Sequence, residues 1–66
     1  MRNTTKLKAI LLKYSVCLDM TDDGIFSLSL VDKMNPSKMH TIEATSYSAV
    51  MAKAYSYLLK ELKKKN

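Results

Sequence analysis

The stretch Ser46–Asn66, SYSAVMAKAYSYLLKELKKKN, decides how this chain folds. Its apolar residues recur at steps of three and four, a spacing that places side chains on one face of a helix. Thr45 or Ser46 can cap the first turn with a hydroxyl oxygen, and the lysine-rich end, residues 60–66, suits the negative end of the helix dipole. We therefore predict a long C-terminal helix whose apolar face consists of Tyr47, Val50, Met51, Ala54, Leu58 and Leu62.

A second apolar set widens this face. It consists of Met51, Tyr55, Leu59 and Leu62. A small sheet does not need so broad a helix face, so the surplus indicates a further apolar surface that packs on the helix. We predict that another protein binds to these four residues or to the edge of the sheet, and that the chain can form a homodimer.

Upstream, two runs of alternating apolar and polar residues predict a β-hairpin. The first runs over Tyr14–Met20 and the second over Phe26–Asp32. Between them, Thr21-Asp22-Asp23-Gly24 contains the only glycine, and Asp-Gly readily takes the positive φ angles of a tight primed turn. We expect an antiparallel pair with one apolar face and one small, polar face.

The segment after the hairpin predicts a loop and a third strand. Pro36 disfavours helix at Asn35 and cannot donate to a sheet, so residues 33–38 are expected to form a loop. A strand is expected over Met39–Ala44, with Ile42 on the apolar side.

The N-terminal segment is open to two interpretations. Leu7, Ile10 and Leu11 follow a possible capping cluster at helical spacing, which predicts a short helix over residues 4–13. No glycine or proline separates this segment from the first strand, so a longer first strand that starts near Leu7 is the alternative.

Together these elements predict an α+β fold in the order α-β-β-β-α. The expected architecture is a two-layer sandwich in which a three-stranded antiparallel sheet packs against the long C-terminal helix. Residues 1–66 suffice for a single small domain, whose modest core would gain from oligomerisation. The other face of the sheet would be polar, small and slightly acidic, with Ser15, Cys17, Asp19, Ser27, Ser29, Thr41 and Glu43 on it.

Composition points to a cytoplasmic protein. Cys17 is the only cysteine, so the chain cannot form an internal disulfide. No apolar run approaches the roughly 20 residues that span a bilayer, and the N-terminal segment lacks the apolar stretch of a signal peptide. We therefore expect no membrane contact.

No residue pattern typical of a catalytic or metal site is present. His40 is the only histidine, and its neighbours in the sequence supply neither an orienting group nor a nucleophile. Cys17 has no cationic neighbour to activate it, and Asp19, Asp22 and Asp23 lack the spacing of a calcium-binding loop. We predict a non-enzymatic protein without a cofactor or a bound metal.

The basic ends support nucleic-acid binding as an alternative function. The formal net charge is +5, with basic residues at both ends and acidic residues in the middle. A phosphate-binding surface could comprise Arg2, Lys6, Lys8, Lys60, Lys63, Lys64 and Lys65. The competing interpretation is that the C-terminal lysines only offset the helix dipole and keep the helix end solvated.

Four short segments carry a resemblance to a known family. They are Tyr14–Asp19, Asp22–Gly24, Phe26–Leu30 and Thr45–Ala49. Together they resemble the N-terminal domain of HicB-type antitoxins, which binds and blocks a small ribonuclease toxin and has no activity of its own. The short, lysine- and methionine-rich chain is also similar in composition to small phage-encoded proteins that inhibit a host factor. Both resemblances imply a protein that binds and inhibits another protein. The charge pattern of the chain suits steering toward an acidic partner.

Overall fold

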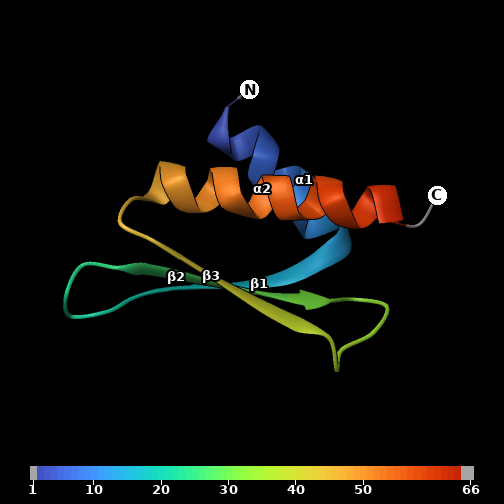
Figure 1. Ribbon diagram of the computed structural model, residues 1–66, viewed down its shortest axis with the longest axis horizontal. Coiled ribbons are helices and arrows are strands. Elements are labelled where there is room, and N and C mark those ends of the chain that lie inside the picture. The colour runs from blue at the N-terminus through green and yellow to red at the C-terminus, as the bar shows by residue number, and fades with distance from the viewer. Residues whose placement is uncertain (1, 65–66) are drawn as a thin grey trace.

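The computed structural model describes residues 2–64 and confirms the predicted α+β fold. The elements are α1 (Asn3–Lys13), β1 (Tyr14–Met20), β2 (Phe26–Asp32), β3 (Met39–Ala44) and α2 (Tyr47–Lys64). The strands form one antiparallel sheet in the order β1-β2-β3, and both helices lie on the same side of it (Figure 1). Residues 65–66 of the lysine-rich end lie outside the described residues.

The N-terminal segment is a helix and not an extension of the first strand. α1 passes directly into β1, because Tyr14 already has extended backbone angles while its N–H still donates to the carbonyl oxygen of Ile10. No side chain caps the start of α1. Asn3 Nδ2 instead donates to Ser48 Oγ at 3.1 Å, and Ile10 is fully buried. Tertiary contacts therefore hold this helix.

β1 and β2 form the predicted hairpin, with Leu18 opposite Leu28. The turn differs from the predicted primed type. The N–H of Gly24 donates to Thr21 O at 2.9 Å, and Gly24 takes a φ of +82°, whereas Asp23 does not have a positive φ. One left-handed glycine after an ordinary turn is the geometry of a hairpin that closes with a bulge.

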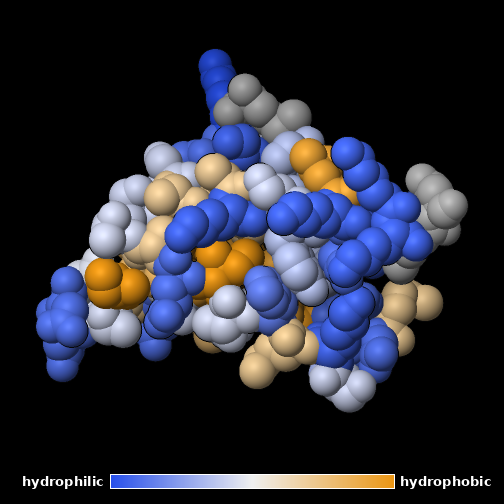
Figure 2. All heavy atoms as spheres, in the orientation of Figure 1, coloured by the Kyte–Doolittle hydropathy of each residue, from blue (hydrophilic) through white to orange (hydrophobic). Residues whose placement is uncertain are grey.

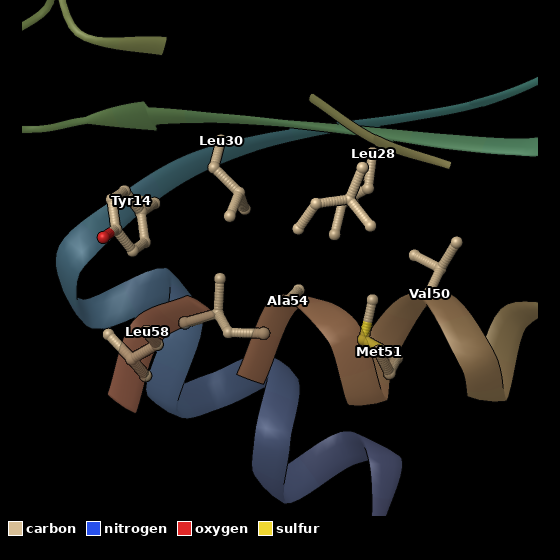
Figure 3. Close-up of a cluster of buried hydrophobic side chains, with 9 residues drawn as sticks. Tyr14, Leu28, Leu30, Val50, Met51, Ala54 and Leu58 are labelled. Carbon is tan, nitrogen blue, oxygen red and sulfur yellow. The ribbon is translucent and has the colours of Figure 1, made fainter. Parts of the chain in front are cut away.

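α2 lies across the sheet and closes the core. Of the two candidate caps, Ser46 is the one used, since its Oγ accepts the N–H of Ala49 at 3.2 Å. Figure 3 shows Leu28 and Leu30 reaching from the sheet toward the side chains of α2. The buried apolar cluster contains Ile10, Tyr14, Leu28, Leu30, Ile42, Val50, Met51, Ala54 and Leu58.

α1 packs mainly against α2 and contacts the sheet much less. As a result α2 covers β2 and β3, whereas Leu18 and Met20 at the far end of β1 remain exposed. No helix covers the other side of the sheet (Figure 1), which we call the open face. Strand alternation and register place on it Ser15, Cys17, Asp19, Ser27, Ser29, Val31, Met39, Thr41 and Glu43.

Candidate functional site

The second apolar set of α2 is largely covered from within the chain. Met51 is 1% exposed and Tyr55 is half-buried, while Leu59 and Leu62 stay exposed. The prediction that Met51 lies on an accessible binding surface is therefore wrong. The apolar face of α2 is broad because α1 of the same chain packs against this flank of the helix.

A groove remains open where α1, α2 and the β2–β3 loop meet. Its volume is about 560 Å³, and Leu58 at its base is buried. Leu12 and Met34 are 84% and 88% exposed, and Leu62 is 47% exposed. We call this site the apolar groove; its lining consists of Ala9, Leu12, Lys13, Lys33, Met34, Leu58 and Leu62.

Lysine contacts bring the loop to the end of α1. Lys33 Nζ donates to Leu11 O at 2.6 Å, and the backbone N–H of Lys33 donates to Lys13 O at 3.1 Å. Two carbonyl oxygens at the end of α1 thus have hydrogen-bond partners. Lys13 Nζ lies 3.7 Å from Asp32 Oδ2. Asp32 Oδ1 accepts the N–H of Met34 at 2.9 Å, which fixes the loop beside the groove. Because Asp32 offsets the charge of Lys13, whose side chain is only 14% exposed, the positive charge at the rim comes from the exposed Lys33.

Of the residues in this groove, only Leu62 belongs to the predicted protein-binding set. Leu12 has a signal in the sequence, because it is an apolar residue off the face defined by Leu7 and Ile10. Met34 is likewise the one apolar side chain in an otherwise polar loop. Neither signal shows that the two side chains meet, since that depends on tertiary contacts.

A buried carboxylate links the β2–β3 loop to α2. Glu61 is 6% exposed, and its Oε1 lies 2.6 Å from Lys38 Nζ while its Oε2 lies 3.4 Å from Lys64 Nζ. The hydrogen bond from Lys38 lowers the pKa of Glu61 and raises the pKa of Lys38. Because both oxygens are occupied, this group acts as a structural ion pair.

Three aromatic rings run from the core to the surface. Tyr14 is buried, and its hydroxyl finds no hydrogen-bond partner within residues 2–64. Burial, and then the nearby Tyr57, Glu61 and Asp32, raise the pKa of Tyr14 to about 12. The Tyr14 and Tyr57 ring centroids lie 6.0 Å apart, and Tyr57 stacks on His40 with centroids 4.1 Å apart and planes within 5°. The contact that positions His40 is thus a stack on the Tyr57 ring and not a hydrogen bond of the kind found in a catalytic triad.

His40 opens onto a second groove, between β3 and α2. We call it the basic groove; it has a volume of about 400 Å³ and is lined by His40, Ile42, Ala52, Lys53, Ser56, Tyr57 and Lys60. Lys53 Nζ donates to Glu43 O at 3.1 Å across its edge. Figure 2 looks onto the side of the molecule where α2 lies in front of α1, and hydrophilic side chains run along the helix above apolar atoms.

The predicted basic residues that the structure describes are spread along both helices. The hydrogen bond from Asn3 to Ser48 places the start of α1 beside the start of α2. Lys60 is twelve residues further along α2, about 18 Å at the helical rise. Arg2, just before α1, is therefore far from Lys60, and Lys65 lies outside the described residues.

Other candidate chemistry is sparse in the described part of the chain. Cys17 is exposed on the open face, and no three His, Cys, Asp or Glu side chains among residues 2–64 are grouped so as to hold a metal ion. No helix over the same residues is long and apolar enough to cross a membrane.

Two grooves on opposite flanks of α2 are thus candidate ligand sites in the described part of the chain. The resemblance of about residues 14–60 to the HicB-type antitoxin domain stays a prediction. Comparison of the chain with family models, with curated proteins and with solved structures finds no match.

Proposed function

We propose that this protein binds another protein through the apolar groove and thereby inhibits it. The observation that supports the proposal most directly is the exposure of Leu12, Met34 and Leu62 around one groove with an apolar base. Exposed apolar patches with a polar rim are typical of protein-binding surfaces. A standard interface covers roughly 800 Å² of each partner. That is about a sixth of the 4664 Å² surface of this chain, so the groove would form the centre of a wider contact.

The rim of the groove favours an acidic partner. Lys33 is exposed beside the apolar side chains, whereas Lys13 is paired with Asp32. Opposite charges across an interface raise the rate of association and fix its orientation. A second copy of the chain is a poorer occupant, because a two-fold contact centred here would bring Lys33 of both copies together. The partner segment we expect carries an apolar side chain between carboxylates.

Inhibition and location are further parts of the proposal. Inhibition rests on the resemblance of about residues 14–60 to the HicB-type antitoxin domain, which acts by covering its target. A cytoplasmic location agrees with a single exposed thiol at Cys17, since that compartment keeps thiols reduced.

A peptide-display selection against the intact chain tests this proposal. The selection uses random peptides, followed by counter-selection on the double variant Leu12→Ser, Met34→Ser. Both side chains are largely exposed, so the variant is expected to fold normally, which thermal melts check. We expect enriched peptides that combine apolar and acidic residues and bind the variant at least tenfold more weakly.

Met39→Ser provides the matched control. Met39 is 64% exposed but lies on the open face, so its substitution removes the same kind of side chain away from the groove. Peptides that lose affinity for Met39→Ser and keep it for the groove variant would contradict the proposal. A wild-type dimer that the groove variant converts to a monomer would do so too, because it would identify a second copy as the occupant.

A further inference from the structure

The basic groove is the second concave site of the molecule, and the proposed function does not use it. It lies on the flank of α2 that faces β3, whereas the apolar groove lies on the flank that faces α1. The two sites share no lining residue. The ligand that fits the basic groove can therefore be inferred from the side chains of that groove alone.

The groove contains a pre-positioned aromatic surface. Tyr57 covers one face of the His40 ring in a nearly parallel stack, 4.1 Å between centroids, and is itself backed by Tyr14. His40 nevertheless remains exposed. A flat ring held in this way offers its outer face to a further planar group, as aromatic side chains do for unpaired nucleobases.

Two lysines lie on either side of this ring pair along α2. Lys53 and Lys60 are seven residues apart, about 10.5 Å at the helical rise, with Tyr57 between them. The hydrogen bond from Lys53 to Glu43 O uses one of three ammonium hydrogens and holds the side chain at the groove edge. The Lys60 ammonium makes no hydrogen bond or ion pair with any other residue of the described chain. Ser56 adds a hydroxyl between the two lysines.

No carboxylate opposes these charges in the groove. None of the lining residues is acidic. Glu61, the only acidic residue of α2, is buried in its ion pairs with Lys38 and Lys64. Glu43 contributes its carbonyl oxygen at the edge, while its side chain belongs to the open face. The groove therefore favours an anion at each end and an aromatic ring in the middle.

We propose that the basic groove binds an unpaired nucleotide within a single-stranded nucleic acid. The base stacks on the outer face of His40, and the phosphates on its two sides contact Lys53 and Lys60. A cation on both sides of the ring site fits a nucleotide flanked by two phosphates, the arrangement at every internal position of a strand. A free mononucleotide shares the base and one phosphate, and a duplex has the phosphates without an accessible base face.

Fluorescence anisotropy with the full chain tests the proposal. The probes are a labelled ten-nucleotide oligo(dT), the same strand paired with its complement, and a labelled mononucleotide, each titrated over a range of salt concentrations. The variants are His40→Ala, His40→Phe and Lys60→Gln. Lys63→Gln is the control, because it removes the same charge from the same end of α2 outside the groove.

The single strand is expected to bind more tightly than the duplex. His40→Ala weakens binding by about fivefold or more, whereas His40→Phe retains a stacking surface and most of the affinity. Lys60→Gln lowers the slope of log affinity against log salt by about 0.7, the change for one phosphate contact with a single strand. Lys63→Gln leaves the slope unchanged.

Other results are equally decisive. If the mononucleotide binds as tightly as the strand, the groove recognises a free nucleotide by its base and one phosphate. That result would overturn the proposal that it binds a strand. Equal affinity for duplex and single strand, or no effect of His40→Ala, would exclude base stacking. Absence of binding to all three probes at low salt would exclude the site.

Discussion

Tyr14 carries a hydroxyl group that the core encloses without a hydrogen-bond partner among the described residues. An unpaired buried polar group costs roughly 1–3 kcal/mol. We therefore expect Tyr14→Phe to leave the free energy of unfolding at pH 7 unchanged or to raise it. Urea denaturation measures this, and a loss of more than about 1 kcal/mol would show that the hydroxyl has a partner in solution.

The same substitution has a signature in alkali. Because the pKa of Tyr14 is raised to about 12 from an ordinary 10.0, its contribution to stability is complete below pH 10 and is lost as the pH rises through 12. Tyr14→Phe removes this loss. The stability of the variant should decline less steeply than that of the wild type when urea melts are repeated between pH 9 and pH 11.5.

Glu61 gives the opposite dependence in acid. The hydrogen bond from Lys38 lowers the pKa of Glu61 below its ordinary 4.5, so the stabilisation is present above pH 4.5 and is lost as the pH falls through the folded-state value. Glu61→Gln should flatten the decline in stability between pH 5 and pH 3. Asp22→Asn in the exposed turn is the control and should leave that decline unchanged.

At the scale of elements, α1 has one side in the core and one in water. Ile10 is fully buried, whereas Leu12, two residues later, is 84% exposed. Ile10→Ala should lower the free energy of unfolding by about 2–5 kcal/mol, because it leaves a cavity between the helices. Leu12→Ala should change it by less than about 0.5 kcal/mol. Chemical denaturation of both variants checks the difference, and equal losses would show that Leu12 is buried in solution.

The elements were predictable because each is a local pattern. Alternation placed β1 and β2, and a period of three to four placed α2, with Thr45 and Ser46 as equal candidates for its cap. The pattern left open whether residues 4–13 form a helix or extend β1. The turn type was not predictable, since Asp-Gly serves both a primed turn and the bulge that Gly24 forms. The width of the apolar face of α2 was interpreted as a sign of a partner, yet Met51 packs in the chain's own core.

The grooves depend on contacts between distant segments. Leu12 and Met34 line one groove because Lys33 binds the carbonyl oxygens at the end of α1. His40 gains its ring partner only when β3 lies beside α2, so its neighbours in the sequence could not reveal Tyr57. Periodicity describes which face of an element is apolar but not which other element covers it. The sequence pattern therefore identified single lining residues, Leu62 and Lys60, but not the grooves to which they belong.

For the whole molecule, the two grooves should act independently. Lys60 and Leu62 are two residues apart on α2 but line different grooves. Leu62→Ser should weaken the selected acidic peptide without altering affinity for oligo(dT), and Lys60→Gln should do the reverse. Titrations of each ligand in the presence of the other measure the coupling. Competition between the two would show that they share one surface.

The open face of the sheet has a practical consequence. Its only thiol, at Cys17, is exposed and lies on the side of the sheet away from both helices. A maleimide dye or a biosensor tether attached there would leave both grooves facing the solution. The native sequence can thus be immobilised in a single orientation, or labelled at a single position for single-molecule work, without an engineered residue.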